Sequence, residues 1–345
     1  MAKRWRYRFL ALTLVCALAG FGWAASYTLR PNDDGSRARL EDFYAQARGG
    51  LDVVFVGSSA AYGFFSPLRI YGQTGLTSAL YATPNQTVAM LPYILRECRR
   101  TQPDALYVVE LRPMLASAED NARIAVDLRR LTDNMPYSLN RARCIEALAP
   151  AGDRLSWHAD LVKYHDRWKD VRPGDLRLSW GRRDENGGFT FDTGVESIEY
   201  RDWRTVNALI PPEAENEAAL RSLLELLRDE PMDVLFVATP FALSREQAKK
   251  YNAVAALLRV YGYDFLDLNR RVEEIGLDFD VDYADFRHVN ILGAAKCSDY
   301  IGPILLARRQ PAAGADRAGW DAALADYLPR EAGAIQAAKE ALEHD

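Results

Sequence analysis

Short apolar runs rich in Val, Leu and Phe recur along the chain, and each ends in small or polar residues. Such runs are typical of buried strands, and we predict strands over residues 51–57, 105–111, 232–238 and 264–268. Other segments have apolar residues at helical spacing and predict helices over 86–100, 214–229, 244–261 and 293–306. Strands that alternate with helices form parallel βαβ units, so we expect a three-layer α/β/α, flavodoxin-like fold.

One long stretch breaks this alternation. Residues 113–213 are rich in Arg, Trp and Asp and contain the pair Gly187-Gly188. We interpret the stretch as an insertion or cap within a single domain that spans residues 51–310.

The last part of the chain, residues 311–345, is rich in Ala and has Trp320, Leu324 and Tyr327 at near-helical spacing. We expect a helical tail there. It is either packed on the body or a partly ordered appendage.

The N-terminal 30 residues predict a membrane anchor. Residues 9–25 carry no charge and are just long enough, at about 1.5 Å per residue, to cross a bilayer. A cluster of cations precedes them: Lys3, Arg4, Arg6 and Arg8. Cations stay in the cytoplasm, so residues 1–30 form a cytoplasmic tip and signal anchor, with the body outside the membrane. The alternative is a signal peptide that is cleaved near Ala24, which would give a secreted protein.

A polar segment, residues 31–50, follows the anchor and is interpreted as a stalk with a short helix. It would hold the body away from the bilayer.

Charge and cysteine content exclude several functions. The 345 residues include 43 basic and 48 acidic ones, and five basic but no acidic residues precede residue 31, which leaves 38 basic and 48 acidic residues in the body. An acidic body argues against nucleic acid as a partner, because phosphate binding needs a basic face. The four cysteines form no CxxC pair, and no phosphate-binding loop or dinucleotide motif is present. We therefore expect no metal site and no cofactor.

Two polar motifs could carry chemistry. One follows the first predicted strand, and the other precedes the last predicted helix of the domain. The first strand ends in Gly57-Ser58-Ser59, which places a serine at a strand-to-helix turn, where it is either an exposed nucleophile or a helix cap. Asp285 precedes His288 by three residues, just before the last helix of the domain. This spacing lets the carboxylate orient the imidazole while the other ring nitrogen faces a serine hydroxyl. The alternative is that His288 is a surface or capping residue.

These residues carry a resemblance. The segment 52–59 together with Asp285-x-x-His288-x-Asn290 resembles the SGNH/GDSL hydrolase superfamily. Further segments resemble a narrower group, the membrane-anchored SGNH proteins of bacterial cell-surface acylation operons, which include D-alanine transfer proteins of teichoic-acid operons and polysaccharide O-acetylation proteins. These segments are 134–140, 163–169, 239–240 and 267–269. The resemblance covers about residues 50–308.

The resemblance implies a role for each motif residue. The nucleophile falls on Ser59, the base on His288 and the acid on Asp285, and the Ser59 backbone N–H is one oxyanion donor. The glycine that usually supplies a second donor is replaced within residues 79–86, where the backbone N–H of Tyr81 or Ala82 takes its place. The Gly-x-Asn-Asp block is absent, and Asn85 or Gln86 is the expected substitute for its side-chain donor.

The resemblance also implies a function. We expect an extracytoplasmic, serine-dependent acyl-ester hydrolase or O-acyltransferase that acts on a cell-surface glycan or a teichoic-acid-like polymer. It would be a single-pass protein of the bacterial cell membrane, with a membrane-bound O-acyltransferase as its partner. The alternatives are a plain secreted esterase and a non-catalytic subunit that binds the polymer or assists assembly.

A second group of side chains, Tyr164, His165, Arg167 and Trp168, permits two interpretations. The aromatic rings and the guanidinium would suit a groove for a carbohydrate or an anionic polymer. Alternatively, Tyr164 and Trp168 form one apolar helix face, and His165 and Arg167 hold a loop in place.

Overall fold

The computed structural model describes residues 2–31, 35–173, 175, 183–312 and 316–344. Its centre is a five-stranded sheet in the order β2-β1-β3-β4-β5, and every neighbouring pair is parallel. The strands are β1 (Val53–Gly57), β2 (Ser78–Ala82), β3 (Leu106–Glu110), β4 (Val234–Ala238) and β5 (Phe265–Asp267). The α/β class and the four predicted strands are confirmed, and β2 is an additional edge strand that the sequence pattern did not indicate.

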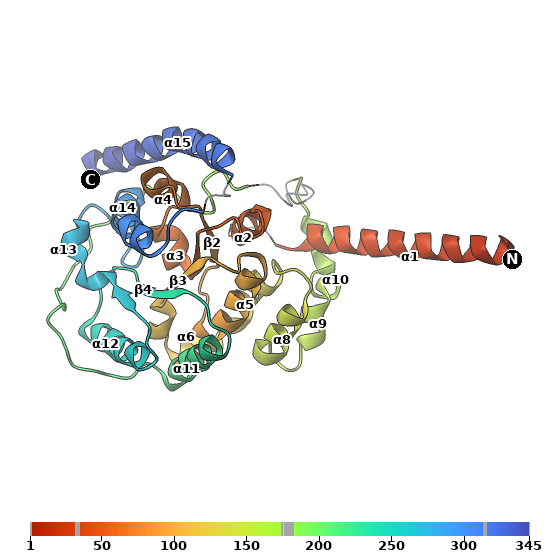
Figure 1. The fold of residues 1–345 in the computed structure, drawn as a ribbon, viewed down its shortest axis with the longest axis horizontal. Coiled ribbons are helices and arrows are strands. Elements are labelled where there is room, and N and C mark those ends of the chain that lie inside the picture. Colours follow the sequence, from red (N-terminus) through yellow and green to blue (C-terminus); the bar gives the residue numbers. More distant parts are fainter. Residues whose placement is uncertain (1, 32–34, 174, 176–182, 313–315, 345) are drawn as a thin grey trace.

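Both faces of the sheet are buried under helices, as the apolar composition of the strands requires. Along β1, Val54 and Val56 belong to one apolar core, and Val53 and Phe55 belong to another on the opposite face. Such alternation follows from the two-residue period of a strand. The arrangement has the layers expected of a three-layer α/β/α fold (Figure 1).

The predicted helices of the domain are confirmed with small changes at their ends. They are η1 (Val88–Met90) with α5 (Leu91–Thr101), α11 (Ala214–Asp229), α12 (Arg245–Val260) and α14 (Ile291–Arg308). Two shorter helices follow β1, α3 (Ser59–Phe64) and α4 (Pro67–Thr74), and α13 (Val272–Ile275) follows β5 and the short η4 (Leu268–Arg270).

The expected insertion begins directly after β3 and consists of short helices. They are η2 (Arg112–Leu115), α6 (Ala118–Ala122), α7 (Ile124–Thr132), α8 (Leu139–Leu148), α9 (Arg154–His158), α10 (Asp160–Lys163) and η3 (His165–Asp170). The described part of the chain from residue 183 to residue 213 has no helix or strand. It runs beside the loop that precedes α14, where Glu196 N–H donates to the Tyr283 carbonyl.

The segment 31–50 is not a free stalk. Its helix, α2 (Ser36–Ala45), packs against β2 and buries Leu40 and Phe43 completely. Arg39 is also buried, and its guanidinium donates to the carbonyls of Gly188 and Ala82. Partners far away in the sequence satisfy this charge, so a polar segment becomes part of the body.

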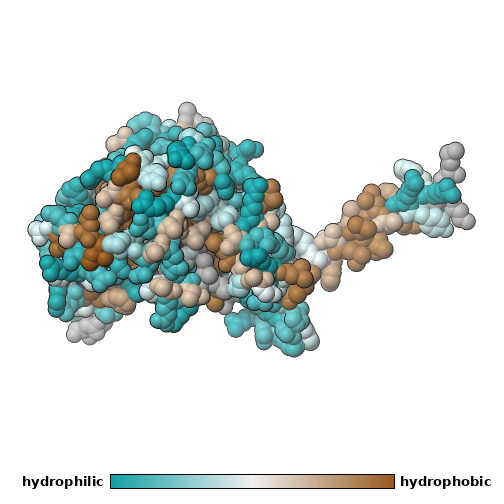
Figure 2. Space-filling view, turned by 90° about the horizontal axis from the view of Figure 1, so that it is seen from below, coloured by the Kyte–Doolittle hydropathy of each residue, from teal (hydrophilic) through white to brown (hydrophobic). Residues whose placement is uncertain are grey.

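Both ends of the chain are long helices. The N-terminal helix α1 (Ala2–Leu29) projects from the body (Figure 1), and its portion Arg4–Leu29 is long and apolar enough to cross a membrane. In Figure 2 the apolar length of this helix separates a hydrophilic tip from the body. The C-terminal helix α15 (Arg317–His344) packs on α4 and α14 and buries Trp320 and Tyr327, so the packed alternative for the tail is correct.

Candidate active site

The end of β1 sets the position of the two serines. Gly57 lies so close to β3 that an added Cβ would be 2.7 Å from the Cβ of Glu110, and only glycine avoids this overlap. Ser58 is the N-cap of α3, and its hydroxyl accepts a hydrogen bond from the Ala60 N–H. Ser59 is the first residue of the helix, so its side chain stands at the edge of the sheet where the strands end.

Ser59, His288 and Asp285 lie in hydrogen-bond contact. The Ser59 Oγ is 2.8 Å from His288 Nε2, and His288 Nδ1 is 2.9 Å from Asp285 Oδ2. Because an ionised carboxylate only accepts, the Nδ1 atom carries the proton in this arrangement and Nε2 is free to accept from the serine. The three residues therefore form the chain of contacts that a serine nucleophile requires.

A tight turn before α14 holds the acid and the base together. Asp285 Oδ1 accepts hydrogen bonds from the backbone N–H groups of Arg287 and His288, at 2.7 and 2.9 Å. Asn290 ends this turn as the N-cap of α14, and its side-chain oxygen accepts from Leu292 and Gly293. The Asp-x-x-His-x-Asn pattern thus encodes a turn whose ends are fixed by its own polar side chains.

The carboxyl of Asp285 is held ionised. Partial burial raises the pKa of Asp285. The hydrogen bond with His288 and the backbone N–H donors lower it by more, so the pKa lies below its usual value. An ionised Asp285 keeps the imidazole in one tautomer and stabilises the imidazolium that forms when His288 takes a proton.

Ser59 and His288 open into a cavity of about 250 Å³. Its walls combine polar and apolar surface and come from the strand ends, the first turns of the insertion and α12. The lining residues include Asn85, Gln86, Arg112, Leu115, Asp120, Asn121, Phe241 and Gln247. The insertion therefore forms one wall of the site, which agrees with the expectation of a cap.

Buried polar side chains beneath the serines complete the site, and the sequence did not single them out. Glu110 ends β3 and is fully buried, which raises its pKa, although the nearby Arg112 charge and hydrogen bonds from Arg112 N–H and Thr239 oppose this rise. Its carboxyl accepts from the Arg112 N–H at 2.9 Å and from the Thr239 hydroxyl at 3.1 Å, and it lies 3.5 Å from the Ser58 hydroxyl. Glu110 and Thr239 lie at or just after the ends of β3 and β4, and the strand-end rule could therefore have drawn attention to both residues.

Arg112 connects Glu110 and Thr239 to the turn that holds Asp285 and His288. Its guanidinium donates to Thr239 Oγ1 at 2.7 Å and to the Arg287 carbonyl at 2.6 Å, one residue before His288. The same group lies over the Phe64 and Phe241 rings. Arg112 thereby ties β3, β4 and the turn 285–288 together, which makes it a positioning residue.

The expected oxyanion donors are only partly found at the cavity. Among the described lining residues, Asn85 and Gln86 are present, whereas Tyr81 and Ala82 are not. Both belong to β2 and are fully buried, and the Tyr81 hydroxyl is bonded to Tyr44 on the far side of the strand. Asn85 has a positive φ of 51° and its side chain lies 3.5 Å from Asp127.

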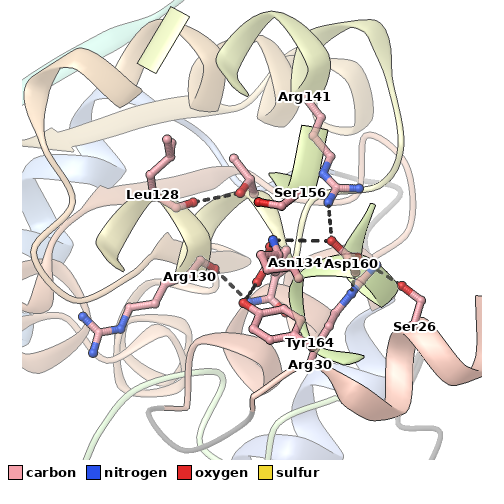
Figure 3. A network of polar contacts seen from close by, with 12 residues as sticks. Ser26, Arg30, Leu128, Arg130, Asn134, Arg141, Ser156, Asp160 and Tyr164 are labelled. Carbon is pink, nitrogen blue, oxygen red and sulfur yellow. Dashed lines mark hydrogen bonds and ion pairs between the residues drawn. The ribbon is translucent and has the colours of Figure 1, made fainter. Parts of the chain in front are cut away.

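The second predicted group lies elsewhere. Tyr164, His165, Arg167 and Trp168 belong to η3 or directly precede it, next to the end of α1, and they do not line the cavity that contains Ser59. Figure 3 shows Tyr164 in the same polar network as Ser26 and Arg30. Arg167 donates to the carbonyls of Thr28 and Arg30, and the Tyr164 hydroxyl donates to Asp133. The structure therefore favours the interpretation in which Arg167 holds a connection in place, although the side chains of Tyr164 and Trp168 do not share one buried face.

Other chemistry is not evident in the described part of the chain. No three His, Cys, Asp or Glu side chains there are grouped to hold a metal ion. Cys98, Cys144 and Cys297 are buried free thiols, and Cys16 is exposed on α1. Comparison with known proteins found no family model and no curated protein that matches the chain.

Proposed function

We propose that the protein is an extracytoplasmic SGNH-like enzyme, a serine-dependent acyl-ester hydrolase or O-acyltransferase that acts on a cell-surface glycan or a teichoic-acid-like polymer. The observation that carries the proposal is the 2.8 Å contact between Ser59 Oγ and His288 Nε2, backed by Asp285. The parallel sheet, the strand-end position of Ser59 and the turn before α14 are the features that the superfamily resemblance implies.

The proposed reaction has two halves. Ser59 Oγ attacks the carbonyl carbon of an acyl ester while His288 Nε2 takes the hydroxyl proton. The tetrahedral intermediate then collapses, the ester C–O bond breaks, and His288 returns the proton to the leaving alcohol. In the second half a sugar or polyol hydroxyl, or water, attacks the acyl-serine, and its proton passes through His288 to Ser59.

The negative oxygen of the intermediate needs hydrogen-bond donors. The backbone N–H of Ser59, at the first position of α3, is the donor that the resemblance implies. Asn85 or Gln86, both on the cavity wall, is the side chain expected to supply a second donor. Loss of one such donor typically lowers the rate by about 10²- to 10³-fold, so a site with few donors would be slow.

The lining of the cavity supports a hydroxyl-rich acceptor. Asp120, Asn121 and Gln247 line it with carboxylate and amide groups, which exchange hydrogen bonds with hydroxyls. An anchor that holds the site near the bilayer would also raise its effective concentration toward a membrane-bound O-acyltransferase that supplies the acyl group.

A serine-directed fluorophosphonate probe tests the proposal. The full-length protein in detergent is expected to become labelled, the Ser59→Ala variant to lose the label, and a matched Ser156→Ala variant to keep it, because Ser156 lies on α9 and does not line the cavity that contains Ser59. If wild type and Ser59→Ala react equally, Ser59 is not the nucleophile.

A second experiment distinguishes a transferase from an esterase and from a non-catalytic subunit. With an acyl-ester donor and a glycan acceptor supplied together, a transferase yields acylated glycan, whereas an esterase releases free acid. Failure of both reactions, together with binding of the polymer, would support the non-catalytic subunit. The backbone donors expected at Tyr81 and Ala82 lie away from the cavity, and this is the observation that favours that second candidate.

A further inference from the structure

The anchor helix does not end in a flexible tether; it enters the body directly. The apolar run ends at residue 25, and the next residues, Ser26 and Tyr27, are already buried in the body. Arg37 of α2 stacks on the Tyr27 ring, with 3.5 Å between its guanidinium carbon and the ring centre. The body therefore begins where the membrane-spanning part ends.

A buried carboxylate fastens this junction. Asp160 is fully buried at the start of α10 and accepts from Ser26 Oγ at 3.2 Å and from the Arg30 guanidinium at 2.9 Å. Arg141 donates to its other oxygen at 3.1 Å, and Tyr137 donates at 3.0 Å. Figure 3 shows Ser26, Arg30 and Arg141 directed at this carboxylate from different elements.

The length of the anchor fixes the height of this junction. An apolar run of residues 9–25 spans about 26 Å as a helix, whereas the hydrocarbon core of a bilayer is about 30 Å thick. The run is short for the bilayer, so the whole of it must be immersed and the Ser26–Asp160 contact lies at the headgroup level. Residues of the body that lie next to this contact and face the bilayer are therefore also at the level of the lipid headgroups.

Exposed apolar side chains surround the junction. Leu161 and Val162 follow Asp160 on α10, with 39% and 56% of their surfaces exposed, and Trp168 on η3 is 67% exposed. Tyr137 is 57% exposed, although its hydroxyl reaches Asp160. In Figure 2 apolar surface also lies on the body beside the base of the projecting helix. We call Tyr137, Leu161, Val162 and Trp168 the juxtamembrane face.

We propose that the juxtamembrane face inserts into the outer headgroup layer of the bilayer, so that the body lies on the membrane in one fixed orientation. The occupant of this surface is lipid, because the face continues from the anchor helix itself. Tryptophan and tyrosine rings are the side chains that favour this interface, and Lys169, which lies over the Trp168 ring, places a cation at headgroup depth. This inference concerns membrane contact alone, and it rests on the anchor rather than on the proposed catalysis.

Site-directed spin labelling of the full-length protein tests the inference. Single cysteines are introduced in a Cys16→Ala background and labelled with a nitroxide, and the protein is reconstituted in vesicles of phosphatidylethanolamine and phosphatidylglycerol. The reporter is Val162→Cys. The matched control is Val260→Cys, another exposed valine, which lies on α12 away from the anchor (Figure 1). A third label at Leu14→Cys, in the middle of α1, reports on the anchor.

The ratio of oxygen to water-soluble nickel-chelate accessibility is the readout. We expect the ratio at position 162 to be higher than at position 260 and lower than at position 14, as a label at headgroup depth requires. Equal ratios at 162 and 260, with a high ratio at 14, would overturn the inference and leave the anchor intact. An aqueous signal at 14, or an intact mass that lacks the N-terminal residues, overturns both. A label at 162 that is immobile and shielded from both reagents indicates contact with a second copy and also contradicts lipid insertion.

Discussion

The Ser59 hydroxyl lies 2.8 Å from the His288 imidazole, although the two residues are 229 positions apart in the chain. The architecture of a parallel sheet explains why the two side chains meet. Ser59 begins the helix after β1, an interior strand between β2 and β3, and His288 belongs to the turn that precedes the last helix of the domain, α14. Segments that leave and enter the sheet at the same edge bring their side chains together there.

Replacement of Asp285 by Asn is expected to lower the rate strongly without unfolding the protein. The amide retains a carbonyl oxygen for the backbone donors at 287 and 288, but it can also donate to Nδ1 and so favour the wrong tautomer of His288. In serine hydrolases with this geometry, the equivalent change costs about 10⁴-fold in kcat. The measurement is turnover of an activated ester, with circular dichroism as the check on folding.

The pattern among variants is as informative as the size of each effect. Ser59→Ala, His288→Ala and the double variant are expected to lose about the same activity, because the two groups act as one unit. Independent, multiplicative losses in the double variant would contradict a shared proton relay.

Gly57→Ala is expected to damage both stability and the site. The added Cβ would lie 2.7 Å from that of Glu110, so β1 and β3 must separate or the turn that carries Ser59 must shift. Overpacking of this kind costs about 1–3 kcal/mol. Thermal unfolding and probe labelling of Ser59 are the measurements.

Gly63→Ala is the matched control for this change. Gly63 lies in α3, the same helix that begins with Ser59, and an added Cβ there has no atom within 4 Å. Alanine in a helix is more stable than glycine by about 1 kcal/mol, so this variant should be neutral or slightly more stable. A comparable loss at both positions would mean that the Gly57–Glu110 approach is not the cause.

The fold was predictable where a strand is apolar in sequence, and burial alone did not decide this, because the missed strand β2 is also buried along its whole length. β1, β3 and β4 are buried along their whole length, and their sequences are correspondingly apolar. β2 was missed because Ser78-Ala79-Leu80-Tyr81-Ala82 mixes small and polar residues, and it becomes a strand through its register with β1. α2 was taken for a stalk because the partners of Arg39, Gly188 and Ala82, are distant in sequence.

Only part of the candidate site could be predicted from the sequence. Asp285 and His288 could be paired from sequence because their turn is local. Ser59 could be added only through the rule for strand ends and the resemblance. Glu110 and Thr239 lie at the ends of predicted strands, but their contacts with each other and with Arg112 join the ends of β3 and β4, and no local pattern contains that pairing.

The stability of the protein is expected to fall as the pH rises from about 4 to 6, with Asp42 as one cause. Burial raises the pKa of Asp42 to about 6, against partial compensation by the Asp184 N–H. The folded state then binds more protons than the unfolded state between the two pKa values, so the destabilisation is fully present above pH 6 and is relieved as the pH falls. The slope of unfolding free energy against pH in detergent is the measurement.

Asp42→Asn should remove much of that slope. The amide oxygen can still accept from Asp184, while the buried charge is gone. A shift of roughly two pKa units corresponds to about 3 kcal/mol, which is the upper bound of the gain at pH 7 and vanishes near pH 4. Asp166→Asn, which changes an exposed carboxyl, is the control and should leave the slope unchanged. An unaltered slope in Asp42→Asn would assign the effect to other groups.

Asp160→Ala is expected to be the most destabilising change at the anchor junction. Burial raises the pKa of Asp160, but the charges of Arg30, Arg141 and Lys163 outweigh this effect and hold the pKa below its usual value. Removal of the carboxylate leaves Arg141, whose side chain is 2% exposed, without its counter-charge, and loss of one partner of a buried pair costs about 3–5 kcal/mol.

The same variant should release the anchor from the body, because Ser26 and Arg30 lose their common acceptor. Chymotrypsin cleavage after Tyr27, which is buried in the intact junction, measures this release at a temperature where the body remains folded. Asp166→Ala is the matched control, since Asp166 is 75% exposed and its ion pair with Lys169 contributes less than about 1 kcal/mol. If Asp160→Ala is cleaved no faster than this control, the junction is held by packing of Tyr27 and Arg37 rather than by the buried carboxylate.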